Sequence, residues 1–229
     1  LTSLSEDENN RGLFAAVLPQ IQHYGNKSFG VNSSTMVAAT NGIEDLILRF
    51  KNVCGWIRIQ LYGNNSTVRS IELKSNNGEK ISGPATIVMS YGNDPVCTVS
   101  EEGYDNIVLD CGVNGVQVSN NSAEPTIFWF SVPPITLEKG FTITIVDNIG
   151  YTMQKSTTKS YSVTRNIARS LSAFLYTPTP DAIFARERNA LIALYNSLGG
   201  EQWTNKENWC SEEPVGNWEG VTMDESGFV

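Results

Sequence analysis

Apolar and polar residues alternate over short segments through much of the chain before residue 165. In Ile57–Leu61, apolar side chains are separated by Arg58 and Gln60. This period of two is typical of a β-strand with one buried face and one face in solvent. The same pattern, or a short apolar run, predicts strands at 68–73, 85–91, 106–111, 115–118, 126–132 and 141–146. Two further strands, 151–155 and 160–164, are expected to pair with each other.

Turn-forming residues separate these segments. Asn-rich turns follow the first two strands at 63–66 and 75–78, and the second contains an Asn-Gly pair, which favours a tight hairpin. The run 126–132 is almost continuously apolar and stops at Pro133, which predicts a central strand covered on both faces. Short strands at this spacing are typical of a β-sandwich or a β-barrel, and we expect a single two-sheet sandwich. We therefore expect a mainly β chain.

The period changes near the C-terminus. Four residues fall at i, i+3, i+4 and i+7, which is the apolar stripe of an amphipathic helix: Leu191, Leu194, Tyr195 and Leu198. Asp181 is a suitable N-cap, and the Gly199-Gly200 pair is a strong stop signal. The Thr/Pro-rich stretch at 177–181 before the helix predicts a stiff linker, and hence a domain boundary.

Three tryptophans follow this helix within a short polar stretch, at Trp203, Trp209 and Trp218. At that density they indicate a compact aromatic core rather than a ligand platform. Together with the helical stripe they form a predicted structural core of seven residues. These are Leu191, Leu194, Tyr195, Leu198, Trp203, Trp209 and Trp218.

The charge of the chain is acidic and uneven. The formal net charge of the 229 residues is −8, and 40% of them are hydrophobic, which is enough for a real core and too much for a disordered chain. Most of the excess acid lies in 181–229. This balance argues against nucleic acid as a partner, because such a surface must be basic. The apolar runs are too short for a membrane-spanning helix.

Several short segments in the first 176 residues occur in an order that is similar to that of a known family. These are Phe50–Gly55, Ser70–Leu73, Val132–Leu137, Gly140–Ile143 and Arg165–Ile167. Over about 12–176 they resemble the fimbrillin-like domains of surface proteins in one group of Gram-negative bacteria. The resemblance implies a transthyretin-like β-sandwich, carried by exported lipoproteins or pilus subunits, without enzymatic activity. Pilus subunits of that family usually hold two sandwiches, whereas one is expected here.

A second resemblance covers 182–229. The segments Ala190–Ser197, Gly199–Trp203, Asn208–Trp209 and Gly216–Val221 resemble the N-terminal cap of leucine-rich-repeat proteins. In such a cap, the helix and the tryptophans seal the open end of the first repeat. No leucine repeat follows, so we expect a cap truncated before its repeats, with the residues after Gly220 mobile or packed on another copy. The plant form of the cap carries two cysteines at places that correspond to Asn217 and Met223, so its disulfide does not carry over.

Candidate reactive groups are few. His23 is the one histidine, and no nucleophile motif surrounds it. The four cysteines, Cys54, Cys97, Cys111 and Cys210, lack the paired spacing of a zinc site. Cys97 and Cys111 could form a disulfide between neighbouring strands, or they could be small buried hydrophobic residues. We therefore expect no catalytic residue, no cofactor and no metal.

These observations predict the N-terminal part of a non-enzymatic adhesion or binding protein at the outer membrane or cell surface of a Gram-negative bacterium. The segment 1–12 would be a flexible tether that follows an upstream lipid anchor, and the sandwich (1–176) would be a spacer or attachment module. Repeats after the cap would bind a protein or glycan, and the exposed cap could self-associate. Two alternatives are a pilus-type subunit that assembles by strand exchange and a carbohydrate-binding accessory module.

Overall fold

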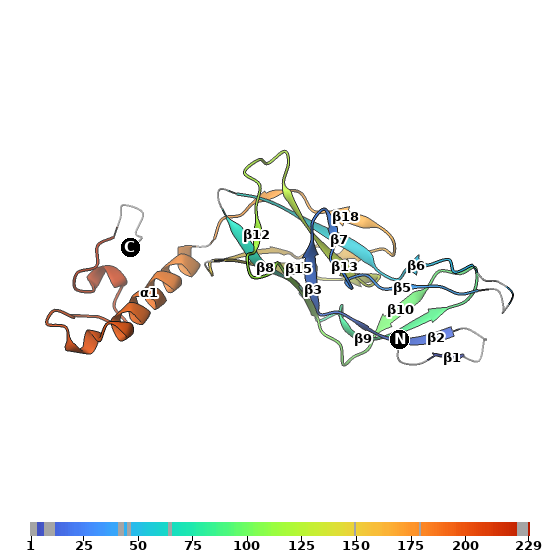
Figure 1. Cartoon of the computed structure of the whole chain (residues 1–229), viewed down its shortest axis with the longest axis horizontal. Coiled ribbons are helices and arrows are strands. Elements are labelled where there is room, and N and C mark those ends of the chain that lie inside the picture. The colour runs from blue at the N-terminus through green and yellow to red at the C-terminus, as the bar shows by residue number, and fades with distance from the viewer. Residues whose placement is uncertain are drawn as a thin grey trace. The chain divides into compact units, whose positions relative to one another are not determined.

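Strands dominate the first two thirds of the chain in the computed structural model, which describes residues 4–6, 12–40, 44, 47–63, 66–148, 150–178, 180–223 and 229. The chain divides into two compact units (Figure 1). The first, called the β unit here, comprises Leu1–Asn148 and Gln154–Tyr176. The second, called the C-terminal unit, comprises Ile149–Met153 and Thr177–Val229. The expectation of a mainly β chain is confirmed, but the described strands form five hydrogen-bonded sheets.

One sheet is built around β7 (Gly55–Tyr62). This strand pairs antiparallel with β13 (Thr126–Val132) and, on its other side, parallel with β18 (Ala168–Ser170) and β19 (Phe174–Leu175). The prediction that 126–132 is a central strand is therefore wrong, since β13 pairs only with β7 among the described strands. The apolar run suggested burial on both faces, but two of its outward-facing residues, Ile127 and Trp129, are large and only half-buried.

The largest sheet has seven strands, in the order β16-β15-β8-β11-β3-β4, with β12 also paired to β8. Its strands are β16 (Thr152–Thr157), β15 (Phe141–Asp147), β8 (Thr67–Ser75), β11 (Asn106–Asp110), β3 (Ile21–Gly25), β4 (Ser28–Phe29) and β12 (Val116–Gln117). Most neighbours are antiparallel, whereas β11 and β3 are parallel.

The remaining strands form a four-stranded sheet and two short pairs. The four-stranded sheet has the order β1 (Leu4–Glu6), β2 (Gly12–Leu18), β9 (Gly83–Met89) and β10 (Val96–Val99). The pairs are β14 (Ile135–Leu137) with β17 (Tyr161–Val163), and β5 (Met36–Val37) with β6 (Lys51–Asn52).

Two sequence expectations are corrected by this topology. Residues 4–6 lie in the segment expected to be a flexible tether, yet they form β1 and pair with β2; residues 1–3 and 7–11 lie outside the described residues. The strands near 151–155 and 160–164 do not pair with each other, because β16 adjoins β15 whereas β17 pairs with β14. Local alternation predicts strands but does not identify their partners.

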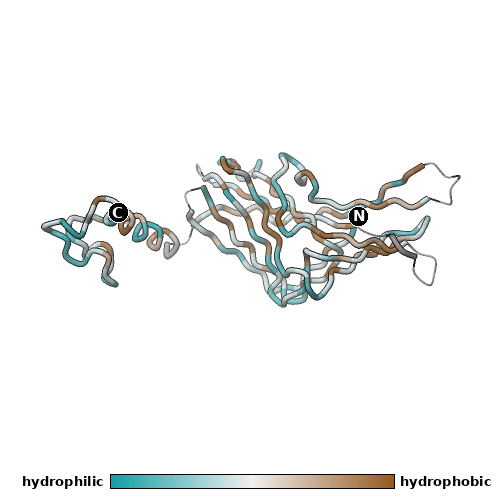
Figure 2. Tube along the Cα trace, turned by 60° about the horizontal axis from the view of Figure 1, so that its bottom comes forward, coloured by the Kyte–Doolittle hydropathy of each residue, from teal (hydrophilic) through white to brown (hydrophobic). Residues whose placement is uncertain are grey.

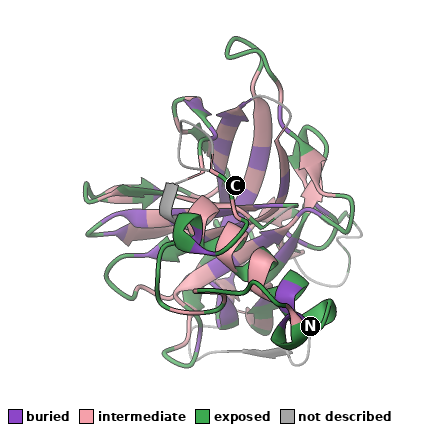
Figure 3. Cartoon of the chain, turned by 90° about the vertical axis from the view of Figure 1, so that its left-hand side faces the viewer, coloured by how far each residue is buried: buried purple, intermediate pink, exposed green. Residues whose placement is uncertain are grey.

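The core of the β unit follows from the alternation of its strands. Hydrophobic and hydrophilic residues alternate along the strands (Figure 2), and buried residues alternate with half-buried ones (Figure 3). The buried side chains come mainly from the seven-stranded sheet and the sheet around β7, and include Ile57, Ile59, Leu61, Ile71, Leu73, Phe128, Phe130, Ile143 and Ile145. Tyr24 on β3 contacts Phe128 on β13, with ring centroids 5.5 Å apart. The two sheets therefore share this core.

The C-terminal unit contains the single long helix of the described chain, α1 (Pro180–Ser197), and two short 3-10 helices, η1 (Gly200–Gln202) and η2 (Val215–Asn217). Proline suits the first helical position because its missing N–H is not needed there. Residues 180–181 of the expected linker thus belong to the helix. Gly199 has a φ of 66°, so the predicted stop at Gly199-Gly200 is confirmed. None of the described helices has the length and apolarity needed to cross a membrane.

Candidate functional site

Four aromatic rings gather beside α1 in the C-terminal unit. Tyr195 stacks on Trp209 at 5.6 Å and meets Trp203 edge-on at 5.3 Å. Trp209 in turn contacts Trp203 at 5.1 Å and Trp218 at 5.3 Å. Offset and edge-to-face contacts of this kind add to the stabilisation that burial of the rings provides. The rings pack as one cluster, here called the aromatic cluster (Tyr195, Trp203, Trp209 and Trp218).

The aromatic cluster is fixed at its edges by hydrogen bonds to nearby carbonyl groups. The indole N–H of Trp209 donates to the carbonyl of Glu219 at 2.8 Å, and that of Trp218 donates to the carbonyl of Glu213 at 3.2 Å. A buried indole N–H needs such a partner. These bonds hold the irregular segment after η1 against the rings.

Arg188 on α1 also holds this segment. Its guanidinium lies 5.0 Å from the ring centroid of Trp218 and donates hydrogen bonds to the carbonyls of Glu213 (2.9 Å) and Ser211. A stacked guanidinium with donors in one plane suits this dual role. Sequence reasoning missed Arg188. Arg188 lies two helical turns before Tyr195 and hence on the same side of α1, and this spacing was the signal that could have identified it.

The seven residues predicted to form the cap core occupy different environments. Tyr195 and Trp218 are buried, whereas Leu191, Trp203 and Trp209 are half-buried. Leu194 is 46% exposed and Leu198 is 62% exposed. The aromatic members therefore meet in one cluster, and Leu194 and Leu198 face solvent in this unit.

An apolar groove of about 430 Å³ lies in the C-terminal unit. It is lined by Phe184, Ala185, Arg188, Pro214, Val215 and Met223. Apart from the guanidinium of Arg188, its walls are uncharged, so it can receive apolar side chains. Of the residues after Gly220, expected to be mobile or packed on a copy, Met223 lines this groove, and residues 224–228 lie outside the described part of the chain.

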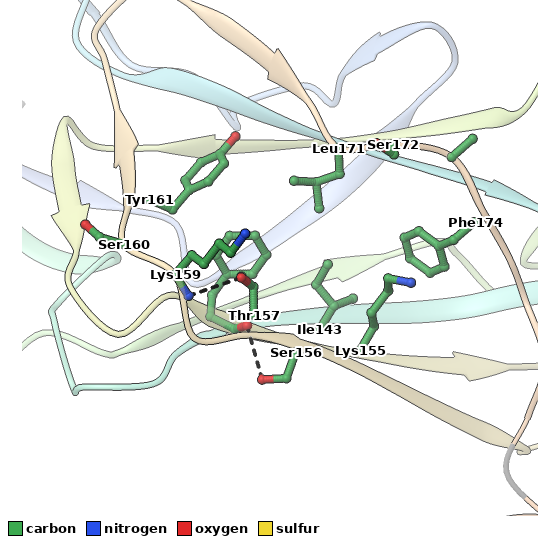
Figure 4. A pocket seen from close by; sticks show the side chains of 12 residues that line it. Ile143, Lys155, Ser156, Thr157, Lys159, Ser160, Tyr161, Leu171, Ser172 and Phe174 are labelled. Atoms are coloured by element: carbon green, nitrogen blue, oxygen red, sulfur yellow. Dashed lines mark hydrogen bonds between the residues drawn. The ribbon is translucent and has the colours of Figure 1, made fainter.

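A side cavity of about 400 Å³ opens in the β unit next to β16 (Figure 4). Its base includes Phe141 and Ile143, which are almost fully buried. Lys155 lies over the ring of Phe174, with its ammonium 4.5 Å from the ring centroid. Lys159 lines the part of the cavity that Tyr161 also lines. The cavity thus joins a core-like interior to a cationic opening. It could accept an apolar group from outside the unit.

The cysteines of the chain are separate thiols. All four cysteines are free, so the candidate Cys97–Cys111 disulfide is not formed. The reason is topological, because β10 carries Cys97 in the four-stranded sheet whereas Cys111 follows β11 of the seven-stranded sheet. Burial raises the pKa of the Cys54 thiol to about 11, and those of Cys97 and Cys111 to about 12. Thiolates are therefore disfavoured at these three positions.

This arrangement predicts selective thiol labelling. At pH 8 under native conditions, only the exposed Cys210 should react rapidly with a disulfide reagent such as Ellman's reagent, and Cys210→Ser should abolish the rapid phase. After denaturation without reductant, all four thiols should titrate. Two thiols in the denatured protein would instead reveal a disulfide.

The lone histidine of the chain lies near a carboxylate. His23 lies on β3, where its Nδ1 is 3.5 Å from a carboxylate oxygen of Asp110, and its side chain is 65% exposed. Within the described ranges, no group of three or more His, Cys, Asp or Glu residues is placed to hold a metal ion. The candidate functional features are therefore the aromatic cluster, the apolar groove and the side cavity.

Comparison with known proteins gives little further information. No family model matches the chain, and no curated protein matches it. Among solved structures, a crystal structure of a candidate cell adhesion protein from Bacteroides ovatus is similar over 71% of this chain, with 9% sequence identity and a TM-score of 0.32. The match spans 65% of that protein's chain, slightly less than two thirds of its length. At this TM-score it does not define a shared fold.

Proposed function

We propose that this chain is a non-enzymatic adhesion or binding protein of the bacterial cell surface. In this proposal, the C-terminal unit is the N-terminal cap of a leucine-rich-repeat domain, and the repeats bind a protein or glycan. The β unit acts as a fimbrillin-like spacer or attachment module, with the seven-stranded sheet and the sheet around β7 packed as one sandwich. An upstream lipid anchor would hold the protein at the outer membrane.

The observation that carries this proposal is the apolar groove beside the aromatic cluster. Tyr195 and Trp218 are already buried within the C-terminal unit, so the unit has its own small core. The groove is additional apolar surface, formed by Phe184, Val215 and Met223 among others. A capping element needs apolar surface of this kind, because it must cover the apolar end of the next repeat.

The proposal is tested by the sequence that the gene encodes after Val229 and by the binding it confers. We expect leucine repeats of about 20 to 29 residues directly after the cap. Protein that includes the repeats should be retained on immobilised matrix proteins or glycans, and residues 1–229 should be retained less. A catalytic domain in place of the repeats, or turnover by the chain itself, would contradict the proposal.

A second candidate function is pilus-type assembly by strand exchange. The side cavity favours it, because β16 is an edge strand of the seven-stranded sheet and the cavity opens beside it. A strand added to β16 from another copy could place alternate apolar side chains in that cavity. Purified protein should then form SDS-resistant ladders that increase with concentration. Ala173→Trp, which fills the cavity, should abolish the ladders, whereas Lys139→Gln should not.

A further inference from the structure

A second cavity in the β unit, of about 530 Å³, lies apart from the side cavity. Its walls come from four strands and one turn. The residues that matter here are Tyr24 on β3, Asn26 and Lys27 in the turn before β4, Arg58 on β7, Gln117 on β12 and Trp129 on β13. A volume of this size is ordinary for a small-ligand site, which typically measures about 300 to 1,000 Å³. We call it the Arg58 cavity.

Arg58 and Trp129 form a pair on one wall of the Arg58 cavity. They are direct cross-strand partners between β7 and β13, and the guanidinium lies 5.1 Å from the centroid of the indole ring. Both residues are half-buried on the sheet face opposite the fully buried Ile59 and Phe128. The pairing fixes the position of the guanidinium by stacking, which leaves its terminal nitrogens able to donate elsewhere.

The polar groups of this pair are incompletely satisfied. The Nε of Arg58 and the Nε1 of Trp129 are both buried, and neither has a hydrogen-bond partner in the described structure. No ion pair of Arg58 is found in the described part of the chain either. A half-buried charge without a counter-charge costs free energy, and an incoming anion would recover part of it.

The charge of the cavity has one sign. Lys27 adds a second cation to that of Arg58, and no Asp or Glu is among the residues that line the cavity. Lys27 holds a left-handed backbone conformation, with a φ of 60°, in the tight turn between β3 and β4. The turn therefore places this cation at the cavity by backbone geometry.

The remaining walls combine ring surfaces with amides. Tyr24 is held in place by its contact with the fully buried Phe128, at 5.5 Å between ring centroids. Asn26 and Gln117 are exposed, and neither side-chain amide has a hydrogen-bond partner among the residues that the structure describes. Each amide offers a donor and an acceptor to a hydroxyl group. Apolar ring faces beside free amides suit a ligand that has both C–H faces and hydroxyl groups.

We propose that the Arg58 cavity binds an acidic sugar, a pyranose with a carboxylate such as a uronic or sialic acid residue of a glycan. The carboxylate would pair with the terminal nitrogens of Arg58, with Lys27 as a second cation. The ring would pack on Tyr24 and the free edge of Trp129, and its hydroxyls would bond to Asn26 and Gln117. This site is independent of the proposed repeats, since all of its residues belong to the β unit.

The test is saturation-transfer NMR and titration calorimetry on residues 1–229 with glucuronate, N-acetylneuraminate, glucose and acetate. We expect one or both acidic sugars to bind at least about tenfold more tightly than glucose or acetate, and binding to weaken with added salt. The two acidic sugars distinguish a uronate from a sialate source. Arg58→Gln should weaken binding at least about tenfold.

Two further variants separate binding from folding. Lys27→Asn removes an exposed charge, and asparagine tolerates the left-handed backbone conformation at this position. The substitution should weaken binding about two- to fivefold without changing the unfolding midpoint. Arg169→Gln removes an exposed arginine from β18 of the same sheet and should have no effect. Equal binding of glucose, equal binding of acetate, an equal loss in Arg169→Gln, or no binding of either acidic sugar would each overturn the proposal.

Discussion

Trp218→Ala is expected to unfold the C-terminal unit or to reduce its stability by about 3 to 5 kcal/mol. The side chain of Trp218 is 1% exposed, and its loss would leave a cavity next to Trp209. It would also remove the ring beneath the guanidinium of Arg188, whose hydrogen bonds hold the segment at Ser211 and Glu213. The substitution therefore removes both the apolar centre of the unit and the support of its polar clamp.

Hydrogen exchange measured by mass spectrometry can resolve this effect by region. Peptides from α1 should exchange at least about a hundredfold faster in Trp218→Ala, because each 1.4 kcal/mol corresponds to a factor of ten. Leu198→Ala is the matched control directly after the same helix, since Leu198 is 62% exposed and its loss should cost less than about 0.5 kcal/mol. Unchanged exchange of α1 in Trp218→Ala would show that the aromatic cluster is not the core of this unit.

The sequence predicted the type of most elements in the β unit between residues 55 and 147, because strand alternation is a local property. Its predictions for pairing were less successful. β13 has the longest uninterrupted apolar run of the predicted strands, yet among the described strands it lies at the edge of its hydrogen-bonded sheet, and β7 is central. Pairing depends on which strands meet after the chain has crossed between sheets, and the local pattern does not contain that information.

The N-terminal strands were missed for a different reason. On β3, the burial is opposite to the hydropathy: Ile21 is 60% exposed, whereas Gln22 is 2% exposed. A pattern method assigns the isoleucine to the core and the glutamine to solvent. The observed arrangement makes sense only when the partner of Gln22 is known, and that partner lies more than one hundred positions away in the chain.

The site residues show the same limit. Tyr195 and the three tryptophans could be predicted as a cluster, because they are large, apolar and close in sequence. Arg188 and the Arg58–Trp129 pair could not, because a guanidinium on a ring is recognised only when the two residues are brought together. For Arg58 that requires the pairing of β7 with β13, two strands separated by more than sixty residues.

Gln22→Met is expected to destabilise the β unit by about 2 to 5 kcal/mol, although it makes a buried side chain more hydrophobic. The Gln22 amide donates to the carbonyl of Ser131 at 2.8 Å and accepts from the N–H of Ser131 at 2.9 Å. These two bonds satisfy the backbone of β13 on the side that no described strand pairs with. Methionine has the same length but neither bond, so two buried backbone groups would lose their partners at about 1 to 3 kcal/mol each.

The comparison with Ile21→Thr separates this effect from a general sensitivity of β3. Threonine is also β-branched, and Ile21 is 60% exposed, so this substitution should change the free energy of unfolding by less than about 0.5 kcal/mol. Urea denaturation followed by far-UV circular dichroism measures both variants against the parent chain. If burial of apolar surface governed position 22, Gln22→Met would be neutral or stabilising. A loss there, with none at Ile21, would instead show that a glutamine side chain completes the hydrogen bonding of β13 where no strand does.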